Sequence, residues 1–132
     1  MKVFLDTNVL VSAFVTRGLC ADLLRLVLTE HELVVGEVVL AELRRVLVQR
    51  VGVPPPVVDE IERFLGEQSV APNPARHLSL GLRDPDDEWI IASAAAGNVD
   101  LLVTGDADIL QAEARLPVRA FTARRAWHML RE

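Results

Sequence analysis

The sequence has few of the features that mark secreted or membrane proteins. It contains a single cysteine, Cys20, so the chain cannot form an internal disulfide, which agrees with a reducing compartment. Its apolar runs are shorter than the roughly 18 residues that a membrane span needs. Asp6 interrupts the N-terminal apolar stretch that a signal peptide would require. We therefore expect a cytoplasmic protein that does not enter the membrane.

Signals for several common cofactors are also missing. The sequence has no Gly-rich phosphate-binding loop. Its three histidines, His31, His77 and His128, are scattered and lack the spacing of zinc ligands. Lysine occurs only at Lys2, so thirteen of the fourteen basic residues are arginine. A nucleotide-binding loop and a zinc centre are therefore not expected.

The net charge of −5 is unfavourable, at first sight, for a protein that binds nucleic acid. Four acids account for most of it, namely Asp6, Glu42, Asp87 and Asp106. Without them the chain would carry −1, and a divalent cation among them would offset half of their charge. The overall charge therefore does not exclude an RNA substrate.

The sequence has the length and composition of one globular domain, which we take as residues 1–132. Of its residues, 51% are hydrophobic and 25% are charged. Apolar runs at 3–5, 33–35 and 101–103 predict buried parallel strands, with shorter strands at 69–71 and 118–121. Helices are predicted at 7–14, from Gly18, at 38–49, from Val57, from Asp84 to about 97, at 107–114 and at 123–130. This alternation predicts an α/β fold with a mostly parallel central sheet flanked by helices.

Two acids follow predicted strands. Asp6 comes directly after the strand at 3–5, and Asp106 follows the strand at 101–103 after a two-residue turn. Sites in open α/β sheets form beyond the carboxyl ends of the strands. Asp6 and Asp106 are therefore expected at the edge where a site would form.

Two further acids lie on apolar helix faces. At about 100° per residue, Asp87 shares a face with Ile91 and Ala94. Glu42 lies at the margin of the apolar stripe within 39–47. A carboxylate on an inward-facing stripe is costly unless it is paired or bound to a metal ion, so both acids are candidate ligands.

Taken singly, each acid has an ordinary structural explanation. Asp6 can cap the helix that follows it, and Glu42 can be a solvated helix residue. The acids of 84–87 can complement a helix dipole, and those of 106–108 can belong to a turn or an N-cap. Four such acids brought together would repel one another unless a cation joined them. The combination therefore favours a metal site.

The same segments resemble the PIN-domain family over essentially the full length of the chain, and within it the VapC-type toxin ribonucleases. Four blocks in order carry the resemblance: VFLDTNVLVSA at 3–13, VVLAELRRVL at 38–47, DPDDEWIIASA at 84–94 and LLVTGDADIL at 101–110. The resemblance implies a small parallel sheet flanked by helices and an acidic cluster that binds Mg²⁺ or Mn²⁺. Hard carboxylate oxygens suit these ions.

The resemblance carries the catalytic and metal-binding roles of the family onto specific acids. These are Asp6, Glu42, Asp87 and Asp106. It implies that Asn8 and Thr104 support the cluster through hydrogen bonds and that Asp84 is an outer ligand. Asp108 is the alternative to Asp106, which we prefer because it lies nearer the strand end.

The implied function is metal-dependent endoribonuclease activity, with a small antitoxin protein as partner and with dimerisation. Arg44 and Arg45 follow Glu42 and are candidates for contact with the RNA backbone, although a solvated helix face also explains them. The alternative is a catalytically inactive PIN-like module that binds RNA or protein. A haloacid-dehalogenase-like enzyme would need an acid where Asn8 stands, and a receiver domain would need a late lysine.

Overall fold

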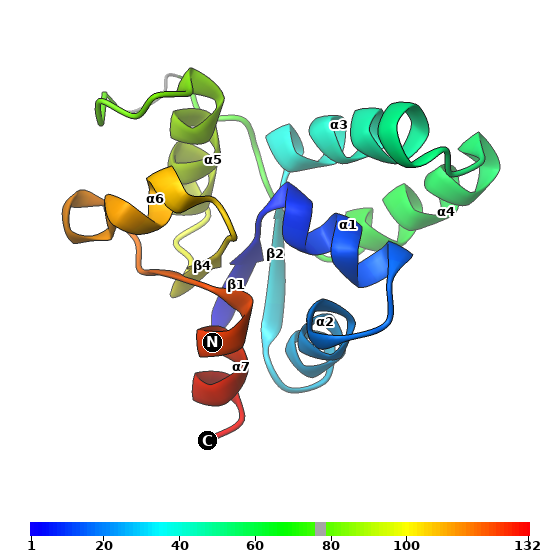
Figure 1. Ribbon diagram of the computed structural model, residues 1–132, viewed down its shortest axis with the longest axis horizontal. Helices are drawn as coiled ribbons and strands as arrows, with labels where there is room; N and C mark the ends of the chain where they lie inside the picture. The colour runs from blue at the N-terminus through cyan, green and yellow to red at the C-terminus, as the bar shows by residue number, and fades with distance from the viewer. Residues whose placement is uncertain (76–78) are drawn as a thin grey trace.

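The computed structural model describes residues 1–75 and 79–132, so His77 lies outside the described residues. Within this part of the chain, five parallel strands form one central sheet (Figure 1). The strands are β1 (Lys2–Leu5), β2 (Glu32–Gly36), β3 (Ser69–Ala71), β4 (Leu101–Val103) and β5 (Ala120–Phe121). The predicted α/β class and all five predicted strands are confirmed, although the last strand begins at Ala120 rather than at 118.

The order of the strands places β1 and β4 side by side at the centre of the sheet. The order is β3-β2-β1-β4-β5, and Leu5 pairs with Val103. From β1 the chain builds outward through β2 to β3, and then returns to add β4 and β5 on the other side. The boundary between β1 and β4 is therefore the switch point of the topology, where open α/β sheets bind ligands.

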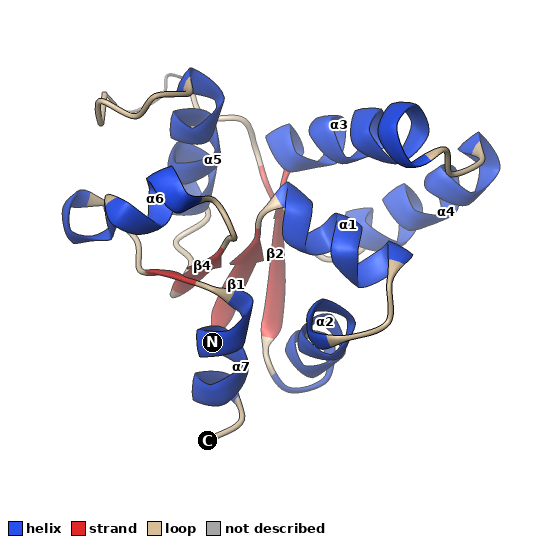
Figure 2. Cartoon of the chain, in the orientation of Figure 1, coloured by secondary structure: helices blue, strands red, loops and turns tan. Residues whose placement is uncertain are grey.

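Seven α-helices surround the sheet in the described residues, and Figure 2 shows that they cover both of its sides. They are α1 (Thr7–Val15), α2 (Leu19–Glu30), α3 (Glu37–Arg45), α4 (Pro55–Gly66), α5 (Pro85–Ala96), α6 (Ala107–Gln111) and α7 (Ala123–Leu130). Because helices cover both faces, β4 and β5 are fully buried and β1 and β2 are buried after their first residue, whereas the edge strand β3 is exposed at Ser69 and Val70. Phe4 and Leu5 are at most 1% exposed, and each such side chain contributes about 1.5–3 kcal/mol to stability.

Three helices differ from their predicted type or bounds. The amphipathic stretch predicted at 38–49 is α-helical only to Arg45 and continues as a π-helix, Val46–Val51. The helix predicted to end at 114 ends at Gln111 and is followed by a 3₁₀ turn, Glu113–Arg115. α4 begins at Pro55 rather than at 57, because proline lacks only an N–H that the first helical turn would leave unpaired.

Within the described residues, none of the helices combines the length and the apolar character needed to cross a bilayer.

Candidate metal centre

A cavity of about 200 Å³ lies at the carboxyl ends of β1 and β4. Its lining includes Asp6 after β1, Glu42 on α3, Asp87 in the first turn of α5, and Asp106 after β4. These four acids are up to 100 residues apart in the sequence. The fold therefore brings all four proposed ligands to one cavity at the switch point of the sheet.

Asp6 is the most deeply buried of the four, with 8% of its surface exposed. Its Oδ1 accepts a hydrogen bond from the Thr7 backbone N–H at 2.7 Å, and its Oδ2 accepts one from the Thr104 hydroxyl group at 2.7 Å. Burial raises the pKa of Asp6, the two hydrogen bonds oppose that rise, and the charge of Asp106 adds to it. The carboxylate of Asp6 is thus held in one orientation at the base of the cavity.

The turn after β4 positions Asp106. Its backbone N–H donates to the Thr104 hydroxyl oxygen at 3.0 Å, and its Oδ1 accepts from the Ile109 N–H at 3.1 Å. Asp106 therefore caps α6, as expected if the acids of 106–108 belong to a turn or an N-cap. The cap uses one carboxylate oxygen, and a carboxylate has further acceptor positions on both oxygens. Capping and ligation are therefore compatible.

Asp87, Asp106 and Asp108 form a tight group, hereafter the carboxylate trio. Each offers a carboxylate oxygen, and these oxygens all lie within 4.8 Å of one another. The pKa of Asp87 is raised to about 7, first by partial burial and then by the charges of Asp106, Asp84 and Asp6. Asp106 and Asp108 were alternatives for the fourth candidate ligand. Both lie close enough to Asp87 to share a cation with it, so one does not exclude the other.

Glu42 enters the cavity from α3 and is half-buried. Burial raises the pKa of its carboxyl group, the nearby Thr7 hydroxyl lowers it, and the charge of Asp6 raises it again. The Thr7 hydroxyl oxygen is itself buried and lies outside hydrogen-bonding geometry with any group in the described chain. Three of the four acids thus have raised pKa values, first because they are buried and then because neighbouring carboxylates repel their charge.

The predicted supporting residues take different places. Thr104 joins Asp6 to the turn that holds Asp106. Asp84 caps α5 by accepting from the Asp86 N–H at 2.9 Å and also lines the cavity. Asn8 lines the cavity from α1, but in residues 1–75 and 79–132 it makes no hydrogen bond to the acids. Thr7 and Thr104 support Asp6 instead.

Two arginines also line the cavity, and the π-helix explains how both reach it. Arg45 and Arg50 are five residues apart, which in an α-helix would turn them about 140° from each other. The i→i+5 hydrogen bonds of Val46–Val51 bring residues five apart onto one side. Gly52 ends the π-helix with a φ of 83°, a conformation that favours glycine. Arg50 was not anticipated, because sequence periodicity assumes an α-helix throughout.

Arg44 points elsewhere, although it was predicted together with Arg45 as an RNA contact. Its guanidinium donates to Asp59 at 2.9 Å and also to Glu62, both on α4. Arg44 does not line the acidic cavity. Its described contacts therefore join α3 to α4.

The donor groups of the cavity fit a hard divalent cation. The ligands available there are carboxylate oxygens, which suit Mg²⁺ or Mn²⁺, and the described residues that line the cavity include neither cysteine nor histidine. The spacing within the carboxylate trio allows one ion to contact all three residues. Without a cation, three acids this close would repel one another.

Glu88 is a buried acid that the sequence did not single out. It is 7% exposed on α5, and its carboxylate accepts a hydrogen bond from the Leu80 backbone N–H. Glu88 therefore anchors the segment before α5 rather than joining the cavity. The only available signal was its position between Asp87 and the apolar run that begins at Trp89, which does not distinguish a ligand from an anchor.

Comparisons with known proteins agree with this architecture. The profile of a family described as PIN domain matches residues 2–108. A search of curated proteins found no match.

Among solved structures, the chain is similar to VapBC2 from Rickettsia felis, crystallised with a DNA fragment from its promoter. That comparison has a TM-score of 0.65 and 21% identity, and covers 92% of this chain and 97% of the other. DNA-bound VapBC from Salmonella typhimurium gives a TM-score of 0.62 at 19% identity, covering 93% and 98%. FitAcB from Neisseria gonorrhoeae gives 0.60 at 16%, covering 96% and 99%. At these identities the similarity establishes the fold.

Proposed function

The chain belongs to the PIN domain family, and from this premise we propose that it is a Mg²⁺- or Mn²⁺-dependent endoribonuclease, the toxin of a VapC-like toxin–antitoxin pair. The observation that carries the proposal is the convergence of Asp6, Glu42, Asp87 and Asp106 on one cavity at the switch point. We assign the whole chain to the domain, because β5 pairs with β4 and α7 packs against α2, so the residues beyond 108 complete the same core.

The proposed site provides ligands for a cation and a place for the scissile phosphate. Asp6, Asp106 and Asp87 would hold the ion, with Asp108 completing the trio. When bound, such an ion lowers the pKa of a coordinated water molecule and offsets the charge that develops on the phosphate. The Thr104 hydroxyl keeps the Asp6 carboxylate facing the site.

Other residues of the cavity have roles in this proposal. Glu42 lines the same cavity but lies outside the carboxylate trio, and we propose that its carboxylate accepts the proton of the attacking water. Arg45 and Arg50 would hold non-bridging phosphate oxygens, for which the guanidinium fork is suited. Attack by water in this site would leave a 5′-phosphate and a 3′-hydroxyl end.

An antitoxin partner is supported by the similar structures, two of which are VapBC complexes bound to DNA. We extend that assembly to this chain as part of the proposal. Dimerisation, which the sequence resemblance implied, stays a prediction.

The direct test is cleavage of fluorescent RNA by the purified chain with Mn²⁺ or Mg²⁺, with and without EDTA. Asp6→Asn should abolish cleavage, because it removes a negative charge from the proposed ligand set with little change in shape. Asp22→Asn is the matched control, since Asp22 is exposed on α2 and pairs with Arg25 away from the cavity. Circular dichroism would verify that both variants fold.

Two outcomes would contradict the proposal. If Asp6→Asn cleaved RNA at the wild-type rate, Asp6 would not be part of the catalytic site. The absence of metal-stimulated cleavage on transfer RNA, ribosomal RNA and messenger RNA would favour the inactive PIN-like binding module instead.

A further inference from the structure

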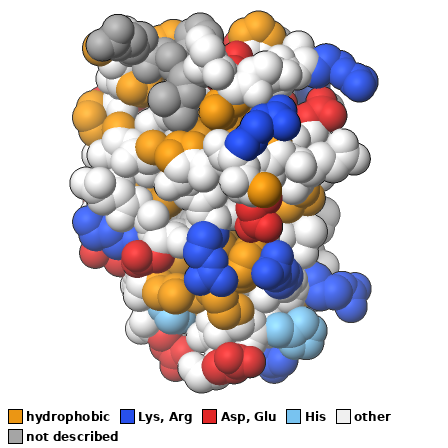
Figure 3. All heavy atoms as spheres, turned by 90° about the vertical axis from the view of Figure 1, so that its left-hand side faces the viewer, with side chains coloured by type: hydrophobic (Ala, Val, Ile, Leu, Met, Phe, Trp, Pro, Cys, Tyr) orange, Lys and Arg blue, Asp and Glu red, His pale blue; other side chains and the backbone are white. Residues whose placement is uncertain are grey.

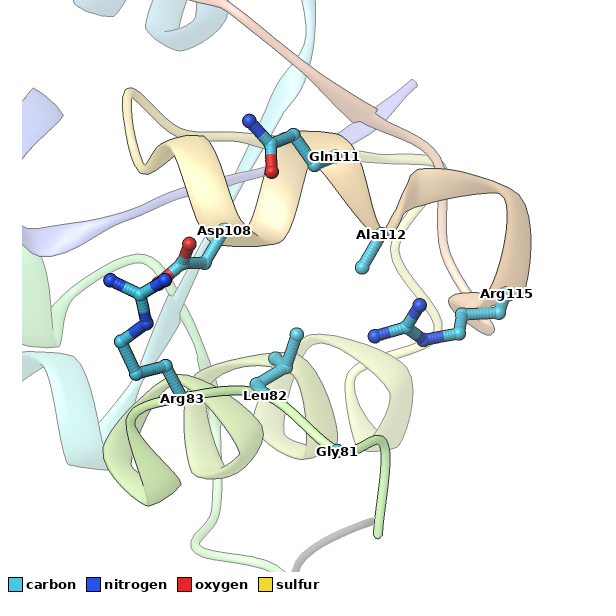
Figure 4. A pocket seen from close by; sticks show the side chains of 7 residues that line it. All are labelled: Gly81, Leu82, Arg83, Asp108, Gln111, Ala112 and Arg115. Atoms are coloured by element: carbon cyan, nitrogen blue, oxygen red, sulfur yellow. The ribbon is translucent and has the colours of Figure 1, made fainter.

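A second, larger hollow of about 540 Å³ lies next to the proposed metal centre, between the segment 81–83 and α6 (Figure 4). We call it the arginine groove after Arg83 and Arg115, which stand at its two ends. Asp108 and Gln111 line it from α6, and Leu82 projects from the opposite wall. The walls thus present two guanidinium groups, one carboxylate and one amide.

The two walls of the groove are tied together by hydrogen bonds. The Leu80 backbone N–H donates to the buried carboxylate of Glu88, and the Leu80 carbonyl oxygen accepts from Arg115 Nε at 3.2 Å. The segment that leads into 81–83 is therefore held from α5 on one side and from the 3₁₀ turn on the other. Because Nε makes this contact, the terminal nitrogens of Arg115 are left directed into the groove (Figure 4).

The groove joins the proposed metal centre at Asp108. This residue lines the groove, and its carboxylate also belongs to the trio within 4.8 Å of Asp87 and Asp106. On the other wall, Arg83 immediately precedes Asp84, which lines the acidic cavity. A polymer whose reacting phosphate lay among the acids could therefore continue into the groove without leaving the surface.

The charge of the groove selects an anionic ligand. It has two arginines against one carboxylate, and that carboxylate would face the bound cation. In the described part of the chain neither arginine forms an ion pair with an acid. The surrounding face, seen in Figure 3, carries both Lys or Arg and Asp or Glu side chains among hydrophobic ones, so the anionic preference rests on the arginines of the groove itself. Arginine forks bind phosphate oxygens in pairs, whereas an apolar protein segment would find few apolar walls here.

We propose that the arginine groove binds the backbone phosphates of single-stranded RNA on one side of the scissile bond. Arg83 and Arg115 are positioning residues that hold the flanking phosphates and so place the reacting phosphate among the acids. Gln111 and Leu82 face the same strand, with an amide for hydrogen bonding and an apolar side chain for contact with a base. The inference rests on the proposed nuclease function and names the path of its substrate.

The test compares steady-state cleavage by the wild type, Arg83→Ala, Arg115→Ala and the double variant. Each single substitution should raise KM by about tenfold, the size of one lost charge-assisted hydrogen bond, while kcat stays within about twofold. The slope of log KM against the logarithm of the salt concentration should decrease by about 0.7 for each phosphate contact removed. Arg63→Ala is the matched control, an exposed arginine on α4 outside both cavities, and should leave KM unchanged.

Shortened substrates give a sharper reading. RNA truncated on the groove side of the cut should be cleaved equally by the wild type and the double variant, while RNA truncated on the other side should keep the full KM difference. Arg115→Lys, which retains the charge, should recover part of the lost affinity. An unchanged KM on long RNA would overturn the proposal, as would an equal rise in KM for both truncated substrates.

Failure of the groove can be separated from failure of the nuclease proposal. If the wild type cleaves no RNA, the proposed nuclease function is wrong. The affinity of the wild type and of the double variant for a fluorescein-labelled single-stranded RNA then tests the groove proposal independently of cleavage. Equal dissociation constants of the wild type and the double variant for this RNA would overturn the proposal that the groove binds RNA. The same result combined with weaker binding of the antitoxin would instead identify the groove as a protein contact.

Discussion

Replacing Asp87 with Asn should stabilise the metal-free protein and remove its response to metal. Asp87 lies in the carboxylate trio, where the oxygens of Asp106 and Asp108 are within 4.8 Å. Above pH 7, the folded protein therefore holds three negative charges close together. The substitution removes the charge of Asp87 and nearly preserves the shape of its side chain. The folded state should gain the repulsion energy that the wild type carries.

The size of this gain follows from the spacing. Two unit charges 4.8 Å apart repel by about 1 kcal/mol in water and by about 3.5 kcal/mol at an effective dielectric constant of 20. All three members of the trio are partly exposed, so solvent and salt hold the value near the lower limit. With two neighbours, Asp87→Asn should raise the free energy of unfolding by about 1–2 kcal/mol, or a few degrees in Tm.

The effect should depend on pH in a defined direction. The pKa of Asp87 is raised from 3.8 to about 7, first by burial and then by its acidic neighbours. Between these values the folded state holds a proton that the unfolded chain has lost. The free energy of unfolding of the wild type should therefore fall as pH rises from about 4 to 7 and level off above 7. The variant lacks this contribution, so the difference should be largest near pH 8 and vanish near pH 4.

Urea denaturation at pH 5 and pH 8, with and without Mn²⁺, measures both effects. The wild type should gain stability from Mn²⁺ at pH 8, because only its folded state forms the site, and Asp87→Asn should gain much less. Asp22→Asn is again the control, since Asp22 also lies in the first turn of a helix but is exposed. A variant that is no more stable than the wild type at pH 8 in EDTA would refute the electrostatic reasoning.

Three further outcomes are expected. Thr104→Val should weaken Mn²⁺ binding by about 10–100-fold in calorimetry, because it removes the 2.7 Å hydrogen bond that orients Asp6; unchanged affinity would show that Thr104 has no orienting role. Gly36→Ala should destabilise the fold by about 1–3 kcal/mol in urea, because an added Cβ would lie 2.5 Å from Ser93 Oγ and 2.9 Å from the Phe4 ring; an unchanged midpoint would contradict that clash. EDTA should abolish RNA cleavage, and excess Mg²⁺ or Mn²⁺ should restore it; activity that persists after chelation would exclude a metal-dependent reaction.

The elements of the fold were largely predictable because local physics determines them. The short apolar run at 101–103, bounded by turn residues, favours a buried strand, and the Asp84-Pro85 pair before a helical pattern favours a helix start; both are found there. The change to a π-helix at Val46 was not predictable, because the apolar spacing of 38–49 fits an α-helix equally well. That change depends on how the segment packs, and it decides whether Arg50 reaches the acidic cavity.

The candidate site was predictable in its residues but not in its geometry. The positions of Asp6 and Asp106 after strands suggested a common edge, and the cavity brings both to it. The sequence could not show that Thr7 and Thr104, rather than Asn8, support Asp6. Nor could it show that Asp108 belongs both to the trio and to the arginine groove. These relations depend on side-chain orientation, which a one-dimensional pattern does not contain.

The amino-acid sequence alone determined the α/β class and the strands, because burial of apolar runs and helix capping act over a few neighbouring residues, and it made the four acids candidates for a site. The tertiary structure alone decided that β1 lies beside β4 and that Thr104 reaches Asp6 across 98 positions of the chain. It also decided that Asp108 belongs both to the carboxylate trio and to the lining of the arginine groove. The physical reason is that strand order and the packing of helices on the sheet are long-range choices. Only these choices fix the distances between charges on which metal and phosphate binding depend.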